Sequence, residues 1–204
     1  MKRTFIALSA LFGLAALAGA APSQGCGGGS ATATLAADSR GGGGGGTLRV
    51  RAKLRGFEET PAISSTGSGS FRAAMAPDGQ SFDFELSYAD LEGGVEGAVG
   101  AAHIHLGQPG VAGGVAVHLC GGGGGTAPCP PSPATISGTF TAANVVGPPG
   151  QGLDAGELGE LVRAMRAGVT YVNVHDARFP GGEIRGQLRP GGGSGEHDED
   201  DDGE

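Results

Sequence analysis

The sequence has few aromatic residues, with no tryptophan and an aromatic content of 5 %. Its 13 Lys and Arg are outnumbered by 21 Asp and Glu, which gives a formal net charge of −8 at pH 7. It contains no basic patch with interleaved aromatics, so nothing in it indicates nucleic-acid binding. Long hydrophobic runs are also absent beyond residues 1–20, which argues against a transmembrane segment in the mature chain.

Only three cysteines occur, too few at close spacing for a thiolate metal site. Cys120 and Cys129 enclose a Gly-rich loop, and in an exported chain a disulfide between them is the default expectation. Cys26 lies in the stretch SQGCGGGS after the apolar N-terminal run. It is either a lipidation site or a free or intermolecularly paired thiol, and Gln24 fits a lipidation motif poorly.

The residue patterns of common hydrolases are missing. No G-x-S-x-G motif occurs, and no serine is placed near a histidine with an orienting acid. Glycoside cleavage needs a tuned pair of carboxylates. Glu58 and Glu59 are expected in a loop, and Asp83 and Glu85 on a solvated strand face. The sequence therefore predicts a protein that is not an enzyme and has no catalytic residues, with metal-dependent redox activity left open.

The two ends of the chain differ in composition from its middle. Residues 1–20 carry two basic side chains, an apolar run and a final A-x-A pattern, which indicate a secretory signal peptide. The mature chain is therefore expected to be secreted, periplasmic or at the cell surface. Residues 21–46 are typical of a flexible Gly/Ser-rich linker, and the acidic tail at 191–204 is expected to be disordered. One domain remains at 47–190, with a Gly/Pro insertion loop at 120–133.

Alternation of apolar and polar residues predicts β-strands throughout this domain. In TLRVRAKLRG the apolar side chains alternate with four basic ones, which predicts one buried and one solvated face. The same alternation in QSFDFELSY follows a Pro-Asp-Gly turn. Further strands are expected at 98–106, 113–119, 135–141, 169–175 and 182–188. About eight short strands favour an antiparallel sandwich or barrel.

One helix is expected to interrupt the strands. Asp154 is a candidate N-cap with Glu157 three residues on, and Gly168 is expected to end the helix. An apolar stripe at helical spacing predicts that the helix packs across the sheet. The stripe consists of Leu158, Leu161, Val162 and Met165.

Three of the expected strands carry hydrogen-bonding or metal-coordinating side chains opposite their apolar residues. Residues two apart on a strand share a face, so His103 and His105 point the same way. A plain solvated face would carry mostly Lys, Ser and Thr, so these side chains are expected to form one polar cluster. Its members are His103, His105, Tyr171, Asn173, His175, Glu183, Arg185 and Gln187.

Several short motifs occur in a distinctive order over 47–189. LRGFEETPA precedes AHIH, and a helix ending in RAG precedes YVNVHDARFPGGEIRGQL. In this order they resemble the CHRD domain, a module named from chordin and also found alone in exported microbial proteins. The resemblance implies an all-β fold, an antiparallel immunoglobulin-like β-sandwich with a distant likeness to copper–zinc superoxide dismutase. The family's biochemical role is not established, so the resemblance implies a fold rather than an activity.

Two hypotheses of function fit the polar cluster. In the first, the chain is a non-enzymatic module for binding or adhesion without a cofactor, and the cluster is a hydrogen-bonded network between strands. Its partner would be an extracellular protein, a polysaccharide or a small ligand, contacted through the loops around 108–109 and 178–180. In the second, His103, His105 and His175 bind Zn²⁺ or Cu²⁺.

Superoxide-dismutase-like chemistry is a remote extension of the metal hypothesis. A paired-metal site needs a further histidine cluster and a well-placed aspartate, and the sequence supplies neither. His118 falls on a different expected strand, and His197 lies in the acidic tail. Neither is expected to complete the three-histidine set.

Overall fold

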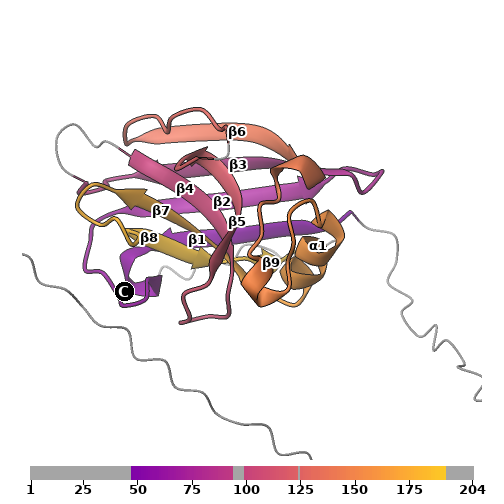
Figure 1. Ribbon diagram of the computed structural model, residues 1–204. Coiled ribbons are helices and arrows are strands. Elements are labelled where there is room, and N and C mark those ends of the chain that lie inside the picture. Colours follow the sequence, from indigo (N-terminus) through magenta and orange to yellow (C-terminus); the bar gives the residue numbers. More distant parts are fainter. Residues whose placement is uncertain (1–46, 94–98, 124, 192–204) are drawn as a thin grey trace, which may run out of the picture. The chain divides into compact units, whose positions relative to one another are not determined.

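The structure is a computed structural model in which residues 47–93, 99–123 and 125–191 are described (Figure 1). The expected signal peptide, the linker with Cys26 and the acidic tail from residue 192 onward lie outside these residues. Those three assignments therefore stay predictions. Within the described residues no helix is long and apolar enough to cross a membrane.

The described residues form nine strands, one α-helix and three short 3-10 helices. The strands are β1 (Arg49–Arg55), β2 (Ser68–Met75), β3 (Ser81–Ala89), β4 (Val99–Leu106), β5 (Gly114–Gly121), β6 (Ala134–Thr141), β7 (Thr170–Asp176), β8 (Ile184–Gln187) and β9 (Arg189–Pro190). The helices are η1 (Gly56–Glu58), η3 (Ala142–Asn144), η4 (Pro149–Gln151) and α1 (Leu158–Arg166). The prediction of an all-β chain with one helix is confirmed.

Helix α1 differs from its expected N-terminus. It begins at Leu158 with Glu157 as the N-cap, so the assignment of Asp154 as N-cap is wrong. The Glu157 carboxylate accepts a hydrogen bond from the Asp154 backbone N–H at 2.9 Å and thereby closes a turn before the helix. The C-terminal prediction is confirmed, because Gly168 follows the helix with φ 68°.

All the strands belong to one antiparallel sheet with the order β5-β4-β7-β8-β1-β2-β3-β6, and β9 pairs with β1. The sheet curls so that β4, β5 and β7 lie in front of β1, β2 and β3 in Figure 1. Its two ends are joined by a β-bridge between Val117 on β5 and Val145, which follows β6. The architecture is therefore nearly barrel-like, and the two-layer immunoglobulin-like arrangement is not confirmed.

The inside of the curled sheet holds the hydrophobic core. Strand β1 shows the predicted alternation, with Val50, Ala52 and Leu54 buried and its basic residues exposed. The apolar stripe of α1 is buried in the same core cluster as these residues. Gly186 is required where β8 passes β1, because a Cβ there would lie 2.3 Å from the Lys53 carbonyl oxygen.

The predicted disulfide between Cys120 and Cys129 is confirmed, with a Cα–Cα distance of 5.0 Å. It fastens the end of β5 to the loop that leads into β6. Nearby, the Tyr88 hydroxyl donates to the Pro130 carbonyl at 2.6 Å, so β3 holds the same loop. The bridge therefore helps to keep the two ends of the sheet together.

Replacing both bridged cysteines with alanine is expected to lower the free energy of unfolding by about 2–3 kcal/mol, because the bond restricts the unfolded chain. Urea unfolding followed by circular dichroism measures the change. Both alanine substitutions are made in a Cys26→Ser variant, which removes the third cysteine. The Cys26→Ser variant alone is the control and is expected to have wild-type stability. Unchanged stability of the double alanine variant in this background would contradict the role assigned to the bridge.

Candidate metal centre

The pairing of β4 with β7 brings three histidines together. In this register Ala101 lies opposite His175, His103 opposite Asn173, and His105 opposite Tyr171. These side chains point away from the core side of the sheet, which Ile104 and its neighbours on β7 fill. His103 and His105 are nevertheless buried, with exposed fractions of 8 % and 6 %.

The three imidazoles meet at close range. The Nδ1 atom of His103 lies 3.2 Å from the Nε2 atom of His175. One ring nitrogen from each of His103, His105 and His175 can be chosen so that all lie within 4.8 Å of one another. The sequence hypothesis named this same set of three residues.

Backbone carbonyls fix the orientation of two of the rings. The Nδ1 of His105 donates to the Gly113 carbonyl at 2.9 Å, and the Nδ1 of His175 donates to the Pro180 carbonyl at 3.1 Å. A carbonyl oxygen only accepts, so both rings carry their proton on Nδ1 and an electron pair on Nε2. The Nε2 atom of His105 is buried without a hydrogen-bond partner, as is that of His103.

The surroundings keep the imidazoles uncharged. Burial and, to a smaller extent, the neighbouring imidazoles together lower the pKa of His103 to about 3. Burial also lowers the pKa of His105 to about 4, against a smaller rise from its hydrogen bond to Gly113. The pKa of His175 is lowered mainly by burial. At neutral pH all three rings are therefore in the form that can coordinate a metal.

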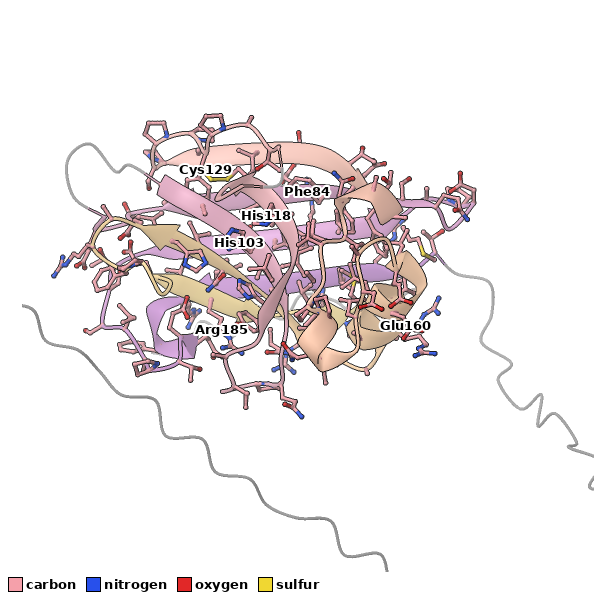
Figure 2. The ribbon with its side chains drawn as sticks, viewed as in Figure 1. Phe84, His103, His118, Cys129, Glu160 and Arg185 are labelled. Carbon is pink, nitrogen blue, oxygen red and sulfur yellow. A yellow bond between two sulfur atoms is a disulfide. The ribbon has the colours of Figure 1, made fainter. Side chains whose placement is uncertain are left out.

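Tyr171 and Arg185 support one side of this cluster. The Tyr171 ring stacks on His105 with ring centroids 4.8 Å apart, and the Arg185 guanidinium lies 3.5 Å from the Tyr171 centroid. Arg185 is itself buried and donates to the carbonyls of Gln108 and Val111, both at 3.0 Å. It therefore holds the β4–β5 loop over the cluster. The positions of His103, His118 and Arg185 on the ribbon are shown in Figure 2.

The remaining members of the predicted polar cluster have different neighbours. Asn173 on β7 is buried; its strand lies between β4, which carries His103 and His105, and β8, which carries Arg185. Gln187 donates to the carbonyls of Gly107 and Gly168 at 2.9 and 2.8 Å, so it joins two loops. Glu183 belongs to a separate network of carboxylates. The eight residues thus divide into a histidine site, its supports and a second polar site.

Two residues beside the site were not predicted. The His118 ring lies 4.7 Å from the His103 ring, although alternation had placed it apart. Glu59 is buried next to Gly182 and has an unpartnered oxygen, and burial raises its pKa to about 7. Glu59 lies in LRGFEETPA, one of the motifs that carry the resemblance to the CHRD domain. That motif could have indicated Glu59, but it was used for the family alone.

A comparison with protein families agrees with this architecture. The model of a family described as the CHRD domain matches residues 50–188, which include the three histidines and the disulfide. The chain belongs to the CHRD domain family. No curated protein and no solved structure matches it. The CHRD domain is a module of unspecified role and not a known enzyme family, so the chemistry of its residues has to suggest a function.

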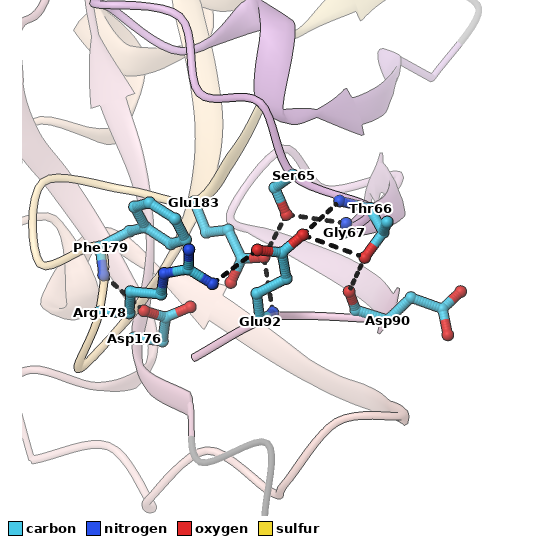
Figure 3. A network of polar contacts seen from close by, with 9 residues as sticks. All are labelled: Ser65, Thr66, Gly67, Asp90, Glu92, Asp176, Arg178, Phe179 and Glu183. Carbon is cyan, nitrogen blue, oxygen red and sulfur yellow. Dashed lines mark hydrogen bonds and ion pairs between the residues drawn. The ribbon is translucent and has the colours of Figure 1, made fainter. Parts of the chain in front are cut away.

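Glu183 is the centre of the second polar site of this CHRD domain (Figure 3). Its side chain is fully buried, and one carboxylate oxygen accepts from the Ser65 hydroxyl and from the Glu92 backbone N–H. Asp176 likewise accepts from the Phe179 N–H with one oxygen, at 2.6 Å. The other oxygen of each carboxyl group is buried and has no partner that can donate unless one group is protonated.

The buried Glu183 carboxyl predicts a pH dependence of stability. Burial and the hydrogen bond to Asp176 raise the pKa of Glu183 to about 7 from an ordinary value of 4.5. A raised carboxyl pKa stabilises the fold below the unfolded value and loses that contribution as pH rises through the folded value. Glu183→Gln mimics the protonated form, so it is expected to gain stability relative to wild type between about pH 5 and pH 8.

Unfolding midpoints of the two proteins across this pH range measure the effect. The exposed Glu85, which pairs with Arg72 at 2.9 Å, offers a control. Glu85→Gln is expected to follow the wild-type profile over the same range. A constant difference in midpoint between Glu183→Gln and wild type would contradict the titration of Glu183 over this range.

Proposed function

We propose that this CHRD domain binds one transition-metal ion through His103, His105 and His175. The observation that carries the proposal is the pair of hydrogen bonds from His105 and His175 to backbone carbonyls. Metal-binding histidines characteristically donate their second ring N–H to such an acceptor, which directs the electron pair of the other nitrogen at the metal. The His105 Nε2 atom is buried without a hydrogen-bond partner, which leaves its electron pair available to an ion.

The spacing of the nitrogens fits one ion. Two ligands at about 2.0–2.1 Å from a tetrahedral zinc lie about 3.3 Å apart. The separation of 3.2 Å between His103 and His175 agrees with this value. A separation of 4.8 Å would shorten by about 1.5 Å on binding, which rotation of the side chains can supply. Three ligands leave a fourth position for water or another group.

The donor set favours zinc or copper. Neutral imidazoles suit Zn²⁺ and Cu²⁺, whereas Ca²⁺ and Mg²⁺ prefer oxygen ligands. The described residues contain no second group of three His, Cys, Asp or Glu close enough to hold an ion. The proposal therefore involves a single ion and does not extend to the paired-metal chemistry of a dismutase.

A metal at this position also supports the expected role in binding or adhesion. The carbonyls that orient the rings belong to Gly113 before β5 and to Pro180 between β7 and β8. These are the two loops through which the sequence analysis expected a partner to be contacted. An ion would fix both loops relative to the sheet, so we infer that its role is to organise a binding surface. The disulfide is consistent with an exported protein in an oxidising compartment.

Metal analysis of the purified full chain tests the proposal. We expect about one Zn²⁺ or Cu²⁺ per chain, with thermal stabilisation that rises with metal concentration, because binding favours the folded state. His103→Gln, which keeps a polar side chain of similar volume, is expected to weaken metal binding about 100-fold, as is His175→Gln.

His118→Gln is the matched control, since His118 touches His103 but lies outside the three-ligand set. It is expected to keep the metal, and His197→Gln shows whether the acidic tail contributes. Folded wild-type protein that neither holds nor gains stability from either metal would overturn the proposal. Equal losses in His118→Gln and His103→Gln would overturn the assigned ligand set.

A further inference from the structure

The exposed face of β1 carries an unusual density of positive charge. Arg49, Arg51, Lys53 and Arg55 alternate with its buried residues and are all exposed. Two more exposed arginines stand on the neighbouring strands, Arg72 on β2 and Arg189 on β9. These six residues, which we call the basic stripe, are the majority of the ten Lys and Arg between residues 47 and 191.

Strand pairing concentrates these cations further. Arg51 lies opposite Arg72 on one side and opposite Arg189 on the other, so three guanidinium groups occupy one row across the sheet. Alternate residues of a strand are about 6.6 Å apart, and the stripe along β1 is therefore about 20 Å long. Like charges directly opposite one another on a sheet repel, and a bound anion relieves that repulsion.

The strands that carry the basic stripe are poor in acidic residues. Strands β1, β2 and β9 contain no Asp or Glu. On β3, Glu85 pairs with Arg72 at 2.9 Å, and Asp83 accepts from the Thr139 hydroxyl at 2.6 Å. The face that carries the basic stripe is therefore positive, although the chain as a whole has a net charge of −8.

Two hollows border the basic stripe. The larger has a volume of about 720 Å³. It combines two cationic side chains, Lys53 and Arg55, with four hydroxyl groups, those of Ser68, Ser70, Ser87 and Thr135. The second has a volume of about 560 Å³. It combines three arginines, Arg49, Arg51 and Arg72, with the carboxylates of Asp83 and Glu85 and the hydroxyl of Ser137. Cations suit the acidic groups of a polymer, and hydroxyl groups suit the hydroxyls of a sugar.

We propose that the basic stripe binds a linear anionic polysaccharide, a polymer of sugars that bears carboxylate or sulfate groups. A single-stranded nucleic acid would need exposed aromatic rings for its bases to stack on. The two aromatics that border the hollows, Phe84 and Tyr88, pack in or against the hydrophobic core instead. An anionic membrane would favour exposed apolar side chains. The exposed large hydrophobics of the described residues are Phe57, Val111 and Val146, none of which lies on β1, β2 or β9.

Binding of the full chain to heparin, polygalacturonate and neutral dextran tests this inference. We expect binding to at least one of the two anionic polymers, none to dextran, and an affinity that falls about tenfold or more between about 50 and 300 mM NaCl. Arg49→Ser/Lys53→Ser removes one cation from each hollow and is expected to weaken binding about tenfold. Metal content should stay unchanged, so this test is independent of the histidine site.

Arg163→Ser/Arg166→Ser is the matched control, because it removes the same charge from helix α1. Equal weakening in both double variants would show attraction to net charge alone and would overturn the site. No binding to either anionic polymer would overturn the proposal outright. Equal or tighter binding of oligo(dT), phosphatidylserine vesicles or the synthetic peptide GEHDEDDDGE would overturn the choice of polysaccharide as the ligand.

Discussion

The antiparallel register between β4 and β7 is the constraint on which the rest of the structure depends. It sets Ile104 opposite Val172 on the core side and, on the other side, sets His103 opposite Asn173 and His105 opposite Tyr171. Since the side-chain period of a strand is two, a slip of one residue would expose the apolar set and bury the imidazoles in the core. The hydrophobic core therefore fixes the position of the histidines, and no metal is needed to assemble the site.

Loops turn this outer face into a second buried layer. Carbonyls of Gly113 and Pro180 accept from two imidazoles, and Arg185 and Gln187 hold further loop carbonyls. Burying polar groups without partners is unfavourable by about 1–3 kcal/mol each, so the unpartnered nitrogens of His103 and His105 oppose folding. A metal ion at the proposed site would satisfy the Nε2 atom of His105.

Sequence reasoning predicted most of the strands and the three-histidine set, because both follow from a strict period of two. It could not predict the irregularities in the pairing of β4 with β5. The register shifts once before His103 and again after Ile104, and the first shift brings His118 opposite His103. Alternation carries no signal for a bulge, so His118 was placed apart from the set. Helix α1 started later than expected because Glu157 caps a preceding turn. Glu59 was missed because loop burial depends on tertiary packing.

The outer face of one continuous sheet thus carries two kinds of chemistry, and loop cover decides between them. Over β4 and β7 the loops exclude water, and burial keeps the imidazoles neutral by lowering their pKa values. Over β1, Arg49 and Lys53 stay exposed, charged and screened by salt. The proposed coordination by neutral buried nitrogens would depend on geometry at the scale of tenths of an ångström. Exposed cations bind through many weak contacts, which depend on charge density. The two proposed sites should therefore respond separately to mutation.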